Sequence, residues 1–154
     1  MKILIVYATY SGSTRLVGSL IDSVLKKTHE TSFRNVFELD PKEFKEYDFV
    51  VLGSNSWVEN KEEGQMNSGY HQLIEKMQDK VLTGKKATIF ALGDSNLYHN
   101  TFCKSAEHLE NFVKEYGGEV VFKPLTIDRF YFDEEGNEKK VTEWAEELSR
   151  FLKQ

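Results

Sequence analysis

Apolar and polar positions follow two periods along this chain, and the two periods alternate from one end to the other. Short runs of consecutive apolar residues, such as Ile3-Leu4-Ile5-Val6, are typical of buried strands. Such runs predict strands at 2–7, 32–39, 47–53, 86–93 and 120–127. Apolar residues spaced three and four apart are typical of amphipathic helices. This spacing predicts helices at 13–27, 70–77, 102–116 and 141–152, and Asp40-Pro41 indicates a further short helix.

This alternation predicts the fold class. Strands that are apolar on both faces are typical of a parallel sheet with helices on each side. We therefore expect an α/β fold with one doubly wound five-stranded parallel sheet, in a single domain spanning 1–154. Polar loops at 7–14, 54–66 and 94–100 follow the first, third and fourth strands. Ligands of open α/β sheets bind at the carboxyl ends of strands, so we expect the functional site there.

The first of these loops surrounds Gly12 with hydroxyl side chains. They belong to Thr9, Tyr10, Ser11, Ser13 and Thr14. The loop leads into a predicted helix, whose N-terminus presents free N–H groups and the positive end of the helix dipole. This unit predicts a phosphate site that binds through dipoles, because no Lys or Arg lies within the loop. An ordinary hydroxyl-rich helix cap is the structural alternative.

Composition narrows the partners and the compartment. The 154 residues carry a formal net charge of −5, and an acidic surface repels nucleic acid. A single cysteine excludes an intrachain disulfide and fits a reducing compartment. The four histidines show no metal-ligand spacing, so we expect no metal site. With no segment of membrane-spanning length and no signal-peptide pattern, we expect a cytoplasmic monomer without membrane contact.

Motifs in all three loops resemble those of the flavodoxins. Thr9-Tyr10-Ser11-Gly12-Ser13-Thr14 is similar to the family's phosphate loop, T/S-x-T-G-N-T, with Ser13 in place of the usual Asn. Gly53-Ser54-Asn55-Ser56-Trp57 resembles the second flavin loop, and Gly93-Asp94-Ser95 with Tyr98 resembles the third. The fifth strand lacks the insertion of long-chain members, so the short-chain type is implied. The resemblance implies strand order 2-1-3-4-5, with FMN bound where that order reverses.

The resemblance also implies how the site holds FMN. The first loop would bind the phosphate, and Trp57 and Tyr98 would stack on the two faces of the isoalloxazine ring. Other residues expected at the flavin are Asn55, Ser56, Val58, Glu59, Leu92, Gly93, Asp94, Phe102 and Cys103. Val58 stands where many flavodoxins carry Gly or Asn, and a β-branched residue resists positive φ.

A flavodoxin is a low-potential electron carrier rather than an enzyme. The resemblance implies that FMN, bound without a covalent bond, carries one electron at a time from a reductase or photosystem to an acceptor enzyme. Carboxylates around the flavin would dock on redox partners with basic surfaces, such as a ferredoxin-NADP-type reductase. Two alternatives stay open: an FMN-dependent NAD(P)H:quinone-type reductase, and a dedicated activator of one metalloenzyme. A phosphorylated receiver domain is disfavoured, because Ala8-Thr9 and Gly53-Ser54 occupy positions where it needs acidic residues.

Overall fold

The main sheet is parallel throughout and follows the predicted order. The computed structural model describes all 154 residues. Its main-sheet strands are β1 (Lys2–Ala8), β2 (Glu30–Asn35), β3 (Phe49–Asn55), β6 (Lys86–Gly93), β7 (Glu119–Val120) and β8 (Leu125–Asp128). The order is β2-β1-β3-β6, and both β7 and β8 pair with the outer edge of β6. The predicted α/β sheet of order 2-1-3-4-5 is therefore confirmed.

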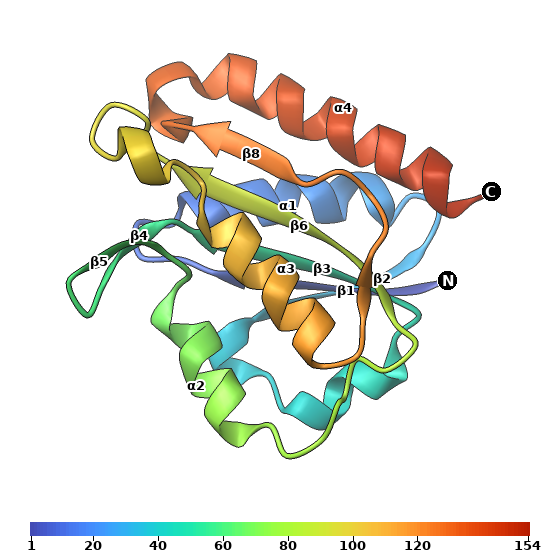
Figure 1. Cartoon of the computed structure of the whole chain (residues 1–154). Helices are drawn as coiled ribbons and strands as arrows, with labels where there is room; N and C mark the ends of the chain where they lie inside the picture. Colours follow the sequence, from blue (N-terminus) through green and yellow to red (C-terminus); the bar gives the residue numbers. More distant parts are fainter.

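Helices cover both faces of this sheet (Figure 1). They are α1 (Ser13–Leu25), α2 (Ser68–Lys76), α3 (Ser105–Glu115) and α4 (Glu134–Leu152). Helices α1 and α4 pack on one face, and α2 and α3 lie on the other. Each face holds a cluster of 18 buried apolar residues, so neither side of the sheet faces solvent. This explains why the central strands are apolar at consecutive positions. No helix has the length and hydropathy needed to cross a membrane.

The second strand ends earlier than predicted. The apolar run at 32–39 suggested that Val36 and Phe37 continue the strand, but β2 ends at Asn35. The Asn35 side chain accepts a hydrogen bond from the backbone N–H of Phe37 (3.0 Å) and caps a 3-10 helix at Val36–Glu38. This local bond replaces the next sheet pairing. The short helix expected at Asp40-Pro41 is present as a 3-10 helix at Pro41–Glu46.

The fifth strand is split into two segments rather than continuous. Pro124 has no N–H to donate, so a run through it loses a ladder bond. Side chains satisfy the interrupted backbone instead. Thr88 Oγ1 donates to the carbonyl of Phe122 (3.0 Å). Trp144 Nε1 donates to the carbonyl of Lys123 (2.9 Å). The chain then re-enters the sheet as β8, whose carboxyl end reaches the same edge as those of β1, β3 and β6.

Two half-buried histidines should make stability depend on pH. Burial lowers the pKa of His29 below its ordinary 6.5, and the N-terminal ammonium and Lys153 lower it further. Burial and the charge of Lys104 do the same for the pKa of His108. The Nε2 atom of each ring is buried without a partner. As the pH falls, these histidines therefore take up protons in the unfolded chain at a higher pH than in the folded protein. We expect the free energy of unfolding to fall as pH drops from about 6.5 toward 5.

Urea denaturation at a series of pH values measures this slope. His29→Gln and His108→Gln should each flatten it, since ordinary carboxylates titrate at lower pH. A double variant with the wild-type slope would contradict the assignment.

Candidate functional site

Four loops meet at the carboxyl edge of the sheet and enclose a cavity of about 700 Å³. They follow β1, β3, β6 and β8, at the end of the molecule opposite the two termini (Figure 1). The cavity is lined by Tyr10, Ser11, Ser13, Asn55, Ser56, Trp57, Leu92, Gly93, Asp94, Tyr98, Arg129, Phe130, Tyr131 and Phe132. Its position at the reversal of strand order is the expected ligand position for this architecture.

The loop after β1 leaves the N-terminus of α1 open. Gly12 is the N-cap residue in a left-handed conformation (φ 91°), which favours glycine, and no side chain caps the helix. Thr9 Oγ1 instead accepts from the N–H of Gly12 (2.9 Å), which shapes the loop. The hydroxyl of Thr14 in the first turn is fully buried and has no partner. An ordinary hydroxyl cap would occupy these groups, so the geometry favours an anion site over that alternative.

The loop after β3 contains a hairpin where only a polar loop was expected. Strands β4 (Trp57–Glu59) and β5 (Glu62–Gln65) pair antiparallel around a turn at Asn60 and Lys61. Its polar residues carry no apolar alternation, so no pattern predicted it. Tyr10 attaches the hairpin to the first loop: its hydroxyl donates to the Glu59 carboxylate, and its ring lies 6.3 Å from that of Trp57.

The hairpin turn places a lysine in a strained conformation. Asn60 (φ 50°) and Lys61 (φ 67°) both have positive φ, the geometry of a two-residue turn that prefers Asn-Gly. Lys61→Gly should therefore stabilise the hairpin by about 0.5–1 kcal/mol. Hydrogen exchange of the β4 and β5 amides measures this local opening. Lys61→Ala is the control, because it removes the charge and keeps the strain. If the β4 and β5 amides are equally protected from exchange in both variants, the stabilisation comes from removal of the lysine charge rather than from relief of strain.

The two aromatic residues expected to enclose a ring lie together at the cavity. Trp57 is 48% exposed, and its ring centroid lies 6.2 Å from that of Tyr98 at an interplanar angle of 64°. A flat ring stacked between two others needs roughly 7–8 Å, two contact distances, between parallel planes. The rings must therefore separate and rotate to form the expected sandwich, which stays a prediction.

The loop after β6 is held by its own side chains. Asp94 Oδ1 accepts from the N–H groups of Asn96 (2.9 Å) and Leu97 (3.1 Å). Ser95 donates to both carboxylate oxygens of Asp128, from its N–H (3.0 Å) and its hydroxyl (2.5 Å). These bonds fix the loop against the end of β8.

The charge state of Asp128 follows from these bonds. Burial acts to raise the pKa of Asp128, but the bonds from Ser95 and the nearby charges of Arg129 and Lys140 lower it, and the lowering is larger. The carboxylate is thus ionised across the neutral range and can hold Ser95 in place.

Phe102 and Cys103 lie behind the cavity wall rather than in it. A side chain at Gly93 would meet the backbone N of Cys103 at 3.1 Å and the ring of Phe102 at 3.2 Å. The buried thiol of Cys103 contacts the carbonyl of Ala91 (Sγ to O, 3.5 Å). Burial raises the pKa of Cys103 to about 12, so it is a neutral packing group at physiological pH.

The structure thus separates the predicted site residues into two groups. Those that line the cavity are Tyr10, Ser11, Ser13, Asn55, Ser56, Trp57, Leu92, Gly93, Asp94 and Tyr98. Those that do not are Thr9, Gly12, Thr14, Val58, Glu59, Phe102 and Cys103. Thr9, Gly12 and Thr14 shape the first loop, and Glu59 binds Tyr10. Contact of either group with a flavin stays a prediction.

Sequence reasoning missed the fourth loop, Arg129–Phe132, which leads into a short 3-10 helix at Phe130–Asp133. Three aromatic residues in a row, separated from the predicted strand 120–127 by only two residues, were the available signal. The next residues begin α4, with the Asp133 side chain accepting from the N–H of Gly136 (3.1 Å). That cap turns the chain into the helix and leaves the fourth loop at the cavity.

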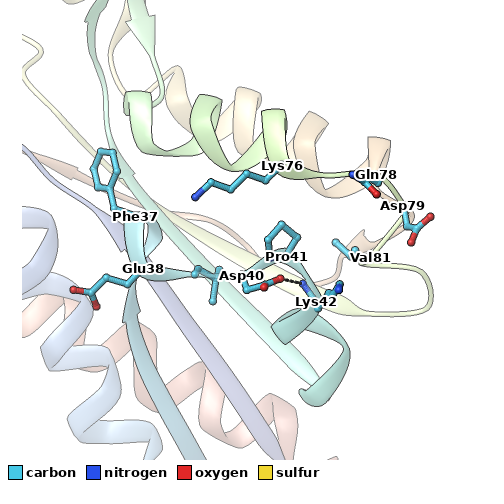
Figure 2. Close-up of a pocket in the computed structure, with 10 residues that line it drawn as sticks. Phe37, Glu38, Asp40, Pro41, Lys42, Lys76, Gln78, Asp79 and Val81 are labelled. Atoms are coloured by element: carbon cyan, nitrogen blue, oxygen red, sulfur yellow. Dashed lines mark hydrogen bonds between the residues drawn. The ribbon is translucent and has the colours of Figure 1, made fainter.

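A second cavity, of about 460 Å³, lies between the 3-10 helices and the end of α2 (Figure 2). Its charged lining residues are of both signs: Glu38, Asp40, Lys42, Lys76 and Asp79. The Asp40 carboxylate already accepts from the N–H of Lys42 (2.9 Å). No predicted site residue lies there, and no group of three or more His, Cys, Asp or Glu in the chain is placed to hold a metal ion.

Comparisons with known proteins give one consistent result. The profile of the flavodoxin family matches residues 5–144. "Probable flavodoxin 2" of Bacillus subtilis is 31% identical over 99% of this chain and 93% of that protein. The crystal structure of oxidised Flavodoxin 2 from Bacillus cereus is 30% identical, with a TM-score of 0.79 over 100% of both chains. The Fusobacterium nucleatum flavodoxin bound to flavin mononucleotide has the same TM-score over 97% of both chains, and at 21% identity it shows the shared fold.

Proposed function

Because this chain belongs to the flavodoxin family, we propose that its four-loop cavity binds one FMN and that the protein carries electrons between redox proteins. Flavodoxins are electron carriers and not enzymes, and this chain, as a member of the family, is an electron carrier. The observation that carries the site assignment is the open N-terminus of α1, whose first residue, Ser13, lines the cavity, together with the buried and unpartnered hydroxyl of the next residue, Thr14.

A second buried polar group without a hydrogen-bond partner also fits bound FMN. The side-chain nitrogen of Asn55 is buried in the cavity wall and has no acceptor, while Asn55 Oδ1 accepts from Asn67 Nδ2 (3.1 Å). A buried amide nitrogen without an acceptor is costly, and a polar edge of a flavin ring supplies acceptors. The orphaned hydroxyl of Thr14 fits a phosphate oxygen in the same way.

Bound FMN supplies the capacity to take up one or two electrons, and the protein supplies position and surroundings. The first loop and the dipole of α1 hold the phosphate without a counter-charge from within the loop. Trp57 and Tyr98 contact the ring and restrict water around it. Acidic residues of the hairpin, Glu59, Glu62 and Glu63, disfavour added negative charge and so support a low potential.

The same hairpin suggests how partners dock. Its carboxylates and the net charge of −5 complement a basic surface, so we propose weak complexes with a basic reductase and a basic acceptor enzyme. Electron transfer from a ferredoxin-NADP-type reductase should slow as ionic strength rises, because salt screens the attraction. A cytoplasmic location and a monomeric state stay predictions.

Titration of the FMN-free protein with FMN tests the cofactor proposal. Stacking on Trp57 and Tyr98 should quench flavin fluorescence with one equivalent bound, and Trp57→Leu should weaken the quenching. NADPH without a reductase should leave the bound flavin oxidised, whereas rapid bleaching would favour the quinone-reductase alternative. A protein that stays colourless after incubation with FMN would refute the proposal.

A further inference from the structure

Arg129 is the one positively charged residue that lines the cavity. It lies at the start of the fourth loop, which none of the flavodoxin motifs includes. The only other charged residue in the lining is Asp94, whose Oδ1 accepts two backbone N–H groups of its own loop. The cavity lining therefore contains one cation and one carboxylate, and the cation forms an ion pair only with Asp128, which is not part of the lining.

The fold holds Arg129 firmly in this position. Its N–H donates to the carbonyl of Gly93 (2.8 Å), and it has a left-handed conformation, φ 45°. Its guanidinium carbon lies 4.4 Å from the ring centroid of Phe132, a cation–π contact. Phe130 is buried in the core beside it, and its carbonyl accepts from Asn137 Nδ2 (3.1 Å). The loop is thus anchored on both sides of the arginine, and a residue held in this conformation is typical of a functional position.

The guanidinium has unused hydrogen-bonding capacity. Its Nε is buried and has no hydrogen-bond partner. Nε forms an ion pair with Asp128 Oδ1 at 3.6 Å, which is longer than a hydrogen bond, and both oxygens of that carboxylate accept from Ser95. The guanidinium has further N–H donors besides Nε–H, and none of them makes a hydrogen bond within the protein, so these are the donors that a ligand would satisfy.

From this arrangement we propose that Arg129 pairs with an anionic group of the bound cofactor. The inference rests on the proposed FMN site. FMN offers two such groups: the phosphate in every redox state, and the ring after uptake of two electrons and one proton, which leaves it with one negative charge. A guanidinium suits either group, because it presents several donors in one plane.

Dissociation constants of Arg129→Gln test the proposal and distinguish the two groups. FMN and riboflavin, both oxidised, are titrated into the FMN-free protein. The midpoint potential of bound FMN is then measured with dithionite as reductant. Loss of a charge-assisted bond predicts roughly ten- to a hundredfold weaker binding of the affected form. If the phosphate is the partner, oxidised FMN binds more weakly and riboflavin is unaffected. If the reduced ring is the partner, the potential falls, by about 30 mV for each tenfold loss in a two-electron couple.

Two further variants make the test specific. Arg150→Gln, on the exposed outer part of α4, removes the same charge far from the cavity and should change neither quantity. Arg129→Lys keeps the charge without the planar donors, so it should retain part of the FMN affinity or midpoint potential that Arg129→Gln loses. It also provides the test if Arg129→Gln perturbs folding. Unchanged affinities and potential in Arg129→Gln would overturn this inference while leaving the FMN site intact. A wild-type protein that binds no FMN would instead remove the proposed function, and this inference with it.

Discussion

Thr14→Val should weaken FMN binding by roughly ten- to a hundredfold and leave the FMN-free protein as stable as before or more stable. The hydroxyl of Thr14 is fully buried and has no partner in the protein. Its burial already costs desolvation energy that nothing within the chain recovers. Valine has nearly the same shape and no polar group, so the substitution removes that cost. A phosphate oxygen, by contrast, loses a charge-assisted hydrogen bond.

Thr88→Val is the matched control for this experiment. Thr88 is also fully buried, but its hydroxyl donates to the carbonyl of Phe122 (3.0 Å). The same substitution there should lower the free energy of unfolding by about 1–3 kcal/mol and leave FMN affinity unchanged. Thr14→Val is thus expected to lower FMN affinity without loss of stability, and Thr88→Val to lower stability without loss of FMN affinity.

Fluorescence titration and urea denaturation provide the two measurements. Riboflavin binding should be insensitive to Thr14→Val, because riboflavin has no phosphate. A Thr14→Val protein that loses stability but binds FMN normally would identify the hydroxyl as structural and place the phosphate elsewhere.

The sheet and its helices could be predicted because each element carries its own local signal. β6 was predicted at its observed bounds, 86–93, since its apolar run is bounded by a lysine and a glycine. Predictions were wrong where a single side chain competes with the pattern. Asn35 ends β2 through its own hydrogen bond to Phe37, and Pro124 interrupts the fifth strand. Both residues are visible in the sequence, but their effect depends on whether another group in the fold can form hydrogen bonds with the backbone groups that leave the sheet.

The site could be predicted only as far as its motifs extend. The loops after β1, β3 and β6 contain motifs with recognisable spacing, and all three line the cavity. The rest of the hairpin beyond Trp57, and the fourth loop, contain no such motif. Their positions depend on contacts between residues far apart in sequence, such as Tyr10 with Glu59 and Ser95 with Asp128. Apolar patterning does not encode such contacts, because they join polar side chains across loops.

Gly53→Ala should destabilise the protein strongly, by about 1–3 kcal/mol or more. Gly53 lies in β3, and a Cβ there would meet the ring of Phe90 at 1.9 Å from Cζ, 2.2 Å from Cε2 and 2.3 Å from Cε1. Phe90 is fully buried, and its Cζ also lies 3.4 Å from where a Cβ on Gly18 of α1 would stand, so the ring has no free space to move into. Without this ring, alanine would be better than glycine in a strand by roughly 0.5–1 kcal/mol.

Phe90→Leu makes the test decisive, because leucine lacks the three ring atoms that would collide with the new Cβ. Alone, Phe90→Leu removes buried apolar atoms and should destabilise the protein. In the Gly53→Ala background it should instead recover stability, so the double variant is more stable than the sum of the single effects implies. Urea denaturation of the four proteins gives this coupling energy directly. Additive effects would show that the backbone of β3, rather than the ring, is what excludes a side chain at position 53.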